Sequence, residues 1–202
     1  MPKDTYYNLP DEKRLRVFNA AVDELIRVPV SEMSINQIIQ NAGISRGSFY
    51  QYFEDKYDLA QYVLADYVVQ FTDAVRASMK ASGGDLFDGL AGLFRNMIEL
   101  AEDETVRKAL MNLIMEAGGK SCTFDYAMAV QQETLDILLE ESDRELLAVE
   151  SEDEIYRLAR VLFAVLKEAA TECLYDFDGA EGVYQEFAAT LDLLRGRMER
   201  RS

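Results

Sequence analysis

The chain has no histidine, no tryptophan, and only two cysteines among its 202 residues. Without histidine, a Ser-His-Asp triad, a Cys-His pair and a histidine-bound metal site are all excluded. Cys122 and Cys173 lie far apart in the sequence, so we expect no disulfide framework and a reducing compartment. We therefore expect no enzyme of these common types, no metal site and no cofactor.

Long apolar runs are also scarce. The longest candidate, Val161 to Leu166, ends at Lys167 and is far too short to cross a bilayer. Residues 1–4 lack the apolar region of a secretory signal peptide. We therefore expect a cytoplasmic protein without a membrane segment.

Proline and glycine, which interrupt helices, number only three and eleven. Alternating runs of β-branched residues are scarce, whereas apolar residues recur at helical spacing in most of the chain. The hydrophobic content of 49% is ordinary for a folded protein, and this length can bury a substantial core without disulfides. The sequence therefore predicts an all-α fold.

The most informative stretch is 34–59, which reads as two short helices joined by a glycine turn and followed by a third helix. Ser34 and Gln37 have the spacing of a capping box, in which each side chain accepts a hydrogen bond from the other residue's backbone N–H. Gly43 stands where a helix end needs a residue that tolerates positive φ. Ser45 can then cap the second helix. This pattern predicts a helix-turn-helix.

The second short helix suits entry into the major groove of DNA. Arg46, Gly47 and Ser48 give it a small, polar and basic leading edge, so the backbone can approach base edges closely. We expect Phe49 and Phe53 to point inward and hold the helix on its scaffold.

This stretch resembles the DNA-binding helix-turn-helix of the TetR/AcrR family of bacterial transcriptional regulators. The resemblance lies in residues 38–43, the run from Ile44 to Phe53, and Lys56 with Leu59. Ile39 departs from it, because the family usually has a small residue there. The resemblance implies an N-terminal three-helix DNA-binding domain, a linking helix, and a C-terminal bundle for ligand binding and dimerisation.

We therefore expect a helix-turn-helix domain in residues 1–53 and a regulatory and dimerisation domain in residues 54–202. Residues 1–10 look like a loose arm before the first helix. A long helix is predicted from about residue 54 to residue 80, leading from the DNA-binding head into the bundle. A second capping box, Ser151 with Glu154, predicts the start of a later helix.

The net charge of −16 opposes nonspecific attraction to DNA phosphates. Its distribution softens this objection, because residues 1–60 hold seven Lys/Arg and nine Asp/Glu, whereas the remainder holds 14 and 28. The acid excess thus lies mostly outside the proposed head. We expect DNA binding that falls steeply with salt.

Arg46 is the strongest candidate for reading a base, because a guanidinium can bind guanine O6 and N7 bidentately. Ser45 and Ser48 can reach bases or phosphates. The TetR resemblance, carried over position by position, implies DNA contacts at Ser34, Ser45, Arg46, Gly47, Ser48, Tyr50, Tyr52 and Lys56.

Two alternatives stay open for the neighbouring side chains. Tyr50 and Tyr52 suit contact with phosphate oxygens, but either ring could instead pack on the scaffold. The basic cluster of Lys13, Arg14 and Arg16, near the start of the first long helix, could contact phosphates or form an ordinary solvated face.

The remaining helices carry many aromatic and methionine side chains, which suit an adaptable apolar cavity. Plain core packing is the alternative for each of them. The resemblance favours a pocket for a small effector. The lack of histidine and the excess of acidic residues give a mild preference for a lipophilic neutral or cationic molecule. The candidate ligand-binding residues are Tyr62, Tyr67, Phe71, Phe94, Met97, Met111, Met115, Phe124, Tyr126 and Met128.

The last two predicted helices have wide apolar stripes, and the resemblance implies that they form a four-helix bundle in a homodimer. A symmetric dimer would present two heads to a palindromic operator. The candidate dimer residues are Leu158, Leu162, Val165, Leu166, Ala169, Phe187, Leu191 and Leu194.

Two other sequence patterns would indicate an enzyme, but each is weaker evidence than the helix-turn-helix. The acidic cluster Glu150, Glu152, Asp153 and Glu154 fits helix-start electrostatics better than acid–base chemistry. Gly118 to Ser121 mimics the end of a phosphate loop, without the earlier glycine or the preceding strand. The sequence thus predicts a ligand-responsive repressor, not an enzyme. The alternative is a helical protein-interaction adaptor with a vestigial DNA-binding head.

Overall fold

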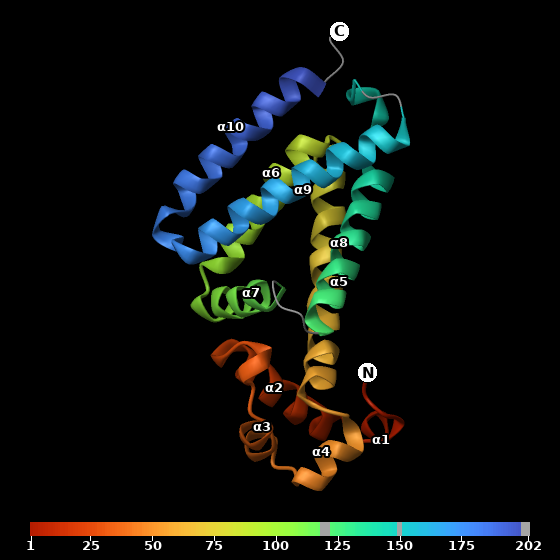
Figure 1. Ribbon diagram of the computed structural model, residues 1–202, viewed down its shortest axis with the longest axis vertical. Helices are drawn as coiled ribbons and strands as arrows, with labels where there is room; N and C mark the ends of the chain where they lie inside the picture. Colours follow the sequence, from red (N-terminus) through yellow and green to blue (C-terminus); the bar gives the residue numbers. More distant parts are fainter. Residues whose placement is uncertain (118–121, 149–150, 199–202) are drawn as a thin grey trace. The chain divides into compact units, whose positions relative to one another are not determined.

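The computed structural model describes residues 1–117, 122–148 and 151–198, and the elements within them are helices (Figure 1). This confirms the predicted all-α fold. Among the described residues, none of the helices is both long and apolar enough to span a membrane.

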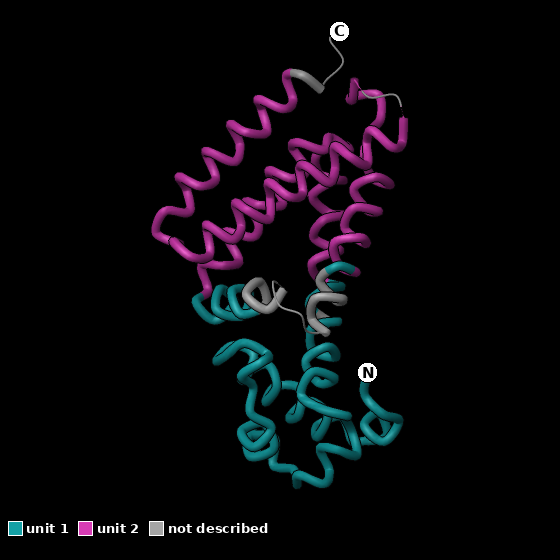
Figure 2. Tube along the Cα trace, viewed as in Figure 1, with its two compact units in different colours: residues 1–69, 104–128 teal, residues 70–103, 129–202 magenta. Residues whose placement is uncertain are grey.

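The described chain divides into two compact units, coloured separately in Figure 2. Unit 1 comprises residues 1–69 and 104–128, and unit 2 comprises residues 70–103 and 129–202. The units therefore alternate along the sequence, because α5 and α8 each contribute to both. The expected division into residues 1–53 and 54–202 stays a prediction.

Unit 1 contains the helix-turn-helix and the elements packed around it. Its elements are α1 (Asp4–Tyr7), α2 (Asp11–Arg27), the 3-10 turn η1 (Val30–Glu32), α3 (Ile35–Ala42), α4 (Arg46–Tyr52), the start of α5 (Lys56–Ala81), α7 (Glu104–Ala117) and the start of α8 (Cys122–Glu141). Its core includes Val17, Ile38, Phe49 and Phe53, all fully buried. The inward direction predicted for Phe49 and Phe53 is thus confirmed.

Three local signals of the helix-turn-helix have the predicted geometry. The Gln37 N–H donates to the Ser34 hydroxyl at 3.4 Å, and the Ser48 N–H donates to the Ser45 hydroxyl at 3.0 Å. Gly43 ends α3 in the left-handed region, with φ of 64°. Side-chain acceptors and a glycine therefore satisfy backbone groups that short helices leave without partners.

The capping box predicted at Ser34 is wrong in its second half. The Ser34 N–H donates to Glu24 Oε1 at 2.7 Å, and the Gln37 amide instead donates to Asn41 Oδ1 at 3.0 Å. A buried carboxylate is a stronger acceptor than a neutral amide, and α2 brings it to the start of α3. By contrast, the box at Ser151 and Glu154 is confirmed.

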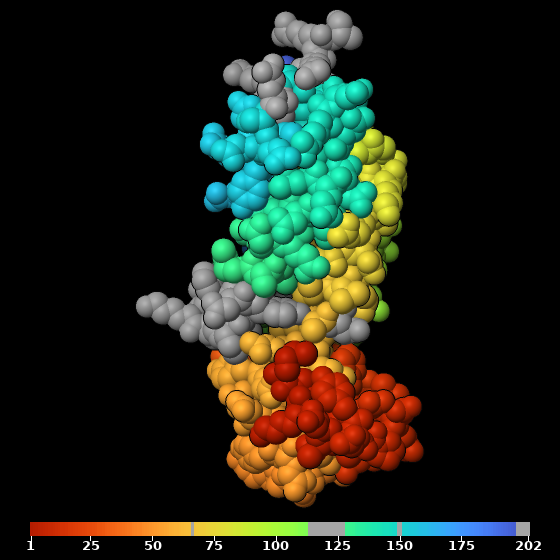
Figure 3. Space-filling model, turned by 90° about the vertical axis from the view of Figure 1, so that its right-hand side faces the viewer, coloured from red at the N-terminus to blue at the C-terminus, as the bar shows by residue number. Residues whose placement is uncertain are grey.

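The loose arm predicted for residues 1–10 is also corrected. Residues 4–7 form α1, Pro2 is buried, and Tyr6 is 0% exposed within the core of unit 1. In the space-filling view of Figure 3, the red atoms of the N-terminal residues lie directly against the orange atoms of the helix-turn-helix. The short segment offers too little apolar periodicity for its packing to be read from the sequence.

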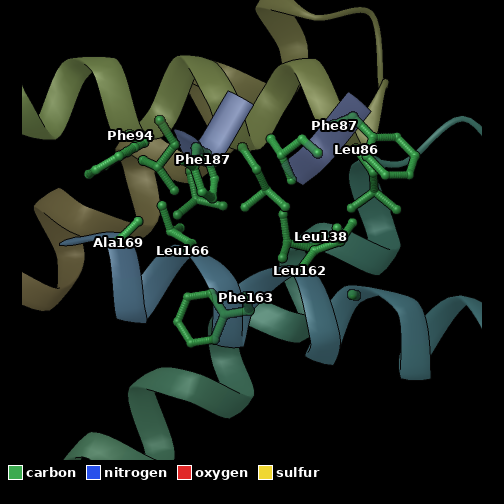
Figure 4. Packing of buried hydrophobic residues seen from close by; sticks show 14 of the residues in the cluster. Leu86, Phe87, Phe94, Leu138, Leu162, Phe163, Leu166, Ala169 and Phe187 are labelled. Carbon is green, nitrogen blue, oxygen red and sulfur yellow. The ribbon is translucent and has the colours of Figure 1, made fainter. Parts of the chain in front are cut away.

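Unit 2 is built on α6 (Leu86–Ala101), α9 (Glu152–Tyr175) and α10 (Ala180–Met198), with the rest of α5 and α8 and the turns η2 (Arg144–Leu146) and η3 (Phe177–Gly179). Figure 4 shows Phe94, Phe187 and Leu162 pointing into one shared interior. The rings of Phe94 and Phe187 meet edge to face, with centroids 4.9 Å apart.

Most of the residues predicted for the dimer face lie in this interior instead. Leu194 and Val165 are partly buried, and the other six are buried: Leu158, Leu162, Leu166, Ala169, Phe187 and Leu191. A side chain buried within its own chain has no surface left for a partner, so these six serve the core. An apolar stripe in a sequence does not say which helix covers it.

Substitution at Gly43 tests the turn between α3 and α4. An added Cβ meets no neighbour within 4 Å, so Gly43→Ala is penalised only by its positive φ. We expect the free energy of unfolding to fall by about 1–2 kcal/mol. The control is Gly47→Ala inside α4, where the added Cβ meets only the Ser45 hydroxyl at 3.8 Å and the chain should gain up to about 1 kcal/mol. Urea denaturation measures both, and equal effects would contradict the assignment of strain to Gly43.

Candidate nucleic-acid interface

The helix α4 presents a polar, basic edge while its apolar residues hold it in place. Ser45, Arg46, Gly47 and Tyr50 are exposed, whereas Phe49 is fully buried. The seven-residue helix is thus anchored by one face and open along the other. No bulky side chain stands at Gly47 to hold a duplex away from the backbone.

Two neutral groups position the guanidinium of Arg46. Its Nη1 donates to Asn36 Oδ1 at 2.7 Å, and its Nη2 donates to the Tyr50 hydroxyl at 3.4 Å. The charge also lies over the Tyr50 ring, 5.8 Å from the centroid. Asn36 stands in the first turn of α3, so both helices of the motif orient this arginine. Because neither partner is anionic, neither of them neutralises the positive charge of Arg46.

The serines of the motif serve as helix caps. Ser45 Oγ accepts from the Ser48 N–H and lies 2.9 Å from Ser48 Oγ, while Ser34 caps α3. A hydroxyl that accepts a hydrogen bond keeps its own proton to donate. Ser34 can therefore hold the start of α3 and still donate its proton, whereas one of the Ser45 and Ser48 hydroxyls already donates to the other.

The three predicted phosphate contacts differ in exposure. Tyr50 is exposed, but Tyr52 is only 5% exposed and its hydroxyl accepts from Lys13 Nζ at 3.2 Å. Tyr52 therefore packs on the scaffold, which was the alternative to a phosphate contact that the sequence left open. Lys56 is half-buried, and its ammonium donates to the carbonyls of Ser31 in η1 and of Met33 just after it. Tyr50 is thus the most accessible of the three.

The basic cluster at the start of α2 is largely paired within the helix. Arg14 forms an ion pair with Asp11, and Arg16 donates to Glu12 Oε1 at 2.8 Å. Lys13 donates to Tyr52 as described above, which ties α2 to the end of α4. Exposed pairs of this kind exchange readily for other partners, so Arg16 could still turn to a phosphate.

Glu24 is a site residue that the sequence reasoning missed. It is 2% exposed and accepts from the Ser34 N–H and from both Nε and Nη2 of Arg27, at 2.8 and 2.6 Å for the guanidinium. The hydrogen bonds from Arg27 lower the pKa of the Glu24 carboxyl, burial opposes this, and the Ser34 N–H lowers it further. The ionised carboxylate therefore joins the end of α2 to the start of the helix-turn-helix.

A second contact reaches the same end of α2 from α7. Asn112 Nδ2 donates to the carbonyls of Leu25 and Ile26 at 2.7 and 3.1 Å. These carbonyls belong to the last turn of α2, where helix carbonyls lack partners within the helix. A single polar residue between apolar ones, such as Asn112 between Met111 and Leu113, is the only sequence signal for this contact.

The predicted ligand-binding residues are divided between the two units. Tyr62 packs in the aromatic cluster of unit 1, and Phe94 is buried in unit 2, so core packing accounts for both. Met111 is half-buried, and Phe71 and Met97 are partly buried against the core of unit 2. Tyr67 and Met128 are exposed. The structure describes only the backbone of Met115, Phe124 and Tyr126, so their side chains lie outside its described part.

Glu24→Gln tests the buried carboxylate. At pH 7 we expect the free energy of unfolding to fall by about 1–3 kcal/mol, because charge-assisted hydrogen bonds are replaced by neutral ones. The folded-state pKa lies below the ordinary value of 4.5, so this contribution is present above that pH and is lost as the pH falls. The difference between the two proteins should therefore shrink in acid, as measured by urea denaturation from pH 7 to pH 3.

The matched control is Glu12→Gln, which removes an exposed carboxylate paired with Arg16 on the same helix. We expect a change within about 0.5 kcal/mol at every pH. If Glu24→Gln behaved like this control, Glu24 would not hold the start of α3.

Comparison with known proteins agrees with this geometry. Residues 17–63 match the sequence model of the family described as bacterial regulatory proteins, tetR family. The HTH-type transcriptional regulator SrpR of Pseudomonas putida is 36% identical over 55 residues, which are 27% of this chain and 26% of that protein. The match thus spans about a quarter of this curated relative.

Solved structures resemble the chain over nearly its whole length. SCO4454, a TetR-family regulator from Streptomyces coelicolor, is 18% identical with a TM-score of 0.72, covering 98% of this chain and 95% of that one. SmeT in complex with triclosan gives 18% and 0.72, covering 94% and 93%. Another structure of SmeT, the repressor of the Stenotrophomonas maltophilia multidrug efflux pump SmeDEF, gives 16% and 0.70, covering 98% and 94%. At these identities the structures show a shared fold. Residues 17–63 thus match the bacterial regulatory proteins of the tetR family, and the chain as a whole shares the fold of the solved regulators.

Proposed function

We propose that the protein is a ligand-responsive repressor that binds a palindromic operator as a homodimer in the cytoplasm. The observation that carries this proposal is the exposed edge of α4, where Asn36 and Tyr50 hold the Arg46 guanidinium without a carboxylate. Regulators of this family are transcription factors and not enzymes. Among the described residues, no group of acidic or cysteine side chains could hold a metal ion.

The proposed contacts with DNA follow from exposure and chemistry. Arg46 reads a base in the major groove, and Gly47 lets the helix backbone come close. Ser45, Ser48 and Tyr50 donate to phosphates or bases, while Ser34 acts at the start of α3. Lys56 contributes positive charge near the motif. Tyr52 acts from the core, by holding α4.

The proposed dimer uses the outer surface of α9 and α10. Val161 and Tyr175 on α9 are 51% and 62% exposed, and Leu193 on α10 is 67% exposed. Val165 and Leu194 are partly buried beside them. These side chains replace the buried six as the apolar contacts that we assign to the partner. A two-fold axis through this surface would give the two heads a fixed spacing.

The proposed effector is a lipophilic small molecule. SmeT, which shares the fold, has been solved with triclosan. An effector can release the operator only if it binds more tightly to a form of the dimer whose heads are wrongly spaced. Within unit 1, the predicted residues that core packing does not account for, Tyr67, Met111 and Met128, are the most suitable contacts for it.

A protein-interaction adaptor remains the second candidate, and the acid excess of the chain favours it. Measuring how tightly the protein binds the DNA upstream of its own gene distinguishes the two functions. A regulator should bind a specific site there with an affinity that falls steeply between about 50 and 200 mM salt. Salt-independent or absent binding would favour the adaptor.

Arg46→Ala tests the base-reading role. We expect specific binding to weaken by about 1–3 kcal/mol and one operator position to lose its base preference, because the bidentate contact to guanine is gone. A gel-shift titration against operator variants measures both effects. Arg144→Ala is the control, since it removes an exposed arginine of unit 2 and should leave both quantities unchanged. Unchanged affinity in Arg46→Ala would exclude Arg46 as a base reader.

A thermal-shift screen tests the effector. Lipophilic neutral and cationic compounds, triclosan among them, should raise the Tm, because a ligand at 100 times its Kd stabilises the native state by about 2.7 kcal/mol. The same compounds should lower operator affinity in the gel-shift assay. A compound that raises the Tm and leaves operator affinity unchanged would contradict a coupled effector site.

A further inference from the structure

The end of α4 is held by residues 3–5, which precede the stretch 17–63 that matches the family model. The Lys3 N–H donates to the Tyr52 carbonyl at 2.8 Å, and Lys3 Nζ donates to the Tyr50 carbonyl at 3.1 Å. The Thr5 hydroxyl donates to the Gln51 carbonyl between them. The last three carbonyls of the helix thus each accept a hydrogen bond from residues 3–5.

These three carbonyls need partners from outside the helix. The final four carbonyls of any α-helix have no N–H further along the helix to bond, and the chain leaves α4 in an extended conformation at Phe53. A helix of seven residues is also too short to be stable in isolation. External hydrogen bonds at this end therefore decide how well its last turn is ordered.

Tyr6 fixes the donors in place. Its side chain is 0% exposed, and its ring centroid lies 4.9 Å from that of Phe53 and 5.2 Å from that of Tyr62 at the start of α5. Its hydroxyl donates to the Arg14 carbonyl at 3.2 Å. Burial raises the pKa of Tyr6, and Tyr62 beside it adds to the rise, so the phenol stays protonated and keeps donating. Tyr6 thus joins the short α1 to both α2 and α5.

We propose that residues 3–6, here called the N-terminal brace, are positioning residues for DNA recognition, because they hold the last turn of the recognition helix α4 in its binding conformation. This inference rests on the proposed function. Lys3 and Thr5 act on the backbone of α4, and Tyr6 anchors them to the core.

The braced turn carries the side chains proposed to meet DNA. Tyr50, whose carbonyl accepts from Lys3, also accepts from Arg46 Nη2 through its hydroxyl. If the last turn opened, Tyr50 would leave Arg46, and the guanidinium would keep only its bond to Asn36. A less ordered helix end thus means a smaller population of molecules with Arg46 in place, which lowers apparent affinity in proportion.

The test uses substitutions that remove the donors without disturbing the core. Thr5→Val is nearly isosteric at an exposed position and deletes only the hydroxyl, while Thr5→Ser keeps it. The double variant Lys3→Met with Thr5→Val removes two of the three bonds. Asn8→Ala, at an exposed position just after α1, is the control for altering this segment.

Hydrogen exchange of the full-length protein, measured without DNA, examines the brace directly. We expect the amides of residues 49–53 to exchange about threefold to tenfold faster in Thr5→Val, from the net worth of one hydrogen bond, and faster still in the double variant. Thr5→Ser and Asn8→Ala should match the wild type. Wild-type exchange in the double variant would overturn the proposal.

Operator titrations then examine the functional part. The double variant should bind about threefold or more weakly than the wild type at one salt concentration, since its competent population is smaller. Thr5→Val alone should keep the wild-type slope of log affinity against log salt, because it removes no charge from the phosphate contacts. Faster exchange with unchanged affinity would overturn the positioning role. If the wild type itself does not bind DNA, the proposed function fails, whereas the exchange result still decides whether the brace orders α4.

Discussion

The structure depends on satisfying backbone groups at the ends of two short helices. With eight and seven residues, α3 and α4 are too short to be stable alone, so their ends need partners from other elements. Ser34 and Ser45 cap their starts, Gly43 turns the chain between them, and Glu24 accepts from the backbone before α3. Residues 3–5 complete the set at the end of α4. The exposed edge of α4 is thus held by a cap at the start of the helix and by hydrogen bonds to its last three carbonyls.

Charge is the second constraint on this protein. The chain carries a formal charge of −16, yet its proposed function requires contact with a polyanion. Pairing within the head resolves part of this conflict, because Glu24, Asp11 and Glu12 each face an arginine of α2. Arg46, which bonds only neutral groups among its recorded partners, keeps its charge for DNA. Binding to a polyanion would therefore depend on where the few cationic side chains lie and not on how many there are.

Local signals in the sequence predicted local structure well. The caps at Ser34, Ser45 and Ser151 and the turn at Gly43 depend only on neighbours a few residues away, and all have the expected geometry. Predictions that depended on residues far away in the sequence were less accurate. Gln37 does not return to the Ser34 N–H, because Glu24 from another helix takes it. The apolar stripes of α9 and α10 bury in the core of unit 2 six of the eight side chains that we had expected at the dimer face.

The sequence by itself determined the all-α class, the helix-turn-helix and the arginine at its leading edge, since helical periodicity, caps and glycine turns act over a few residues. Only the tertiary structure decided that Tyr6 anchors the N-terminal residues in the core, that Tyr52 is buried and that Glu24 and Asn112 meet the same end of α2. Each of these contacts joins residues far apart in the chain. A pattern along the sequence shows which face of a helix is apolar, whereas the fold alone decides what covers it.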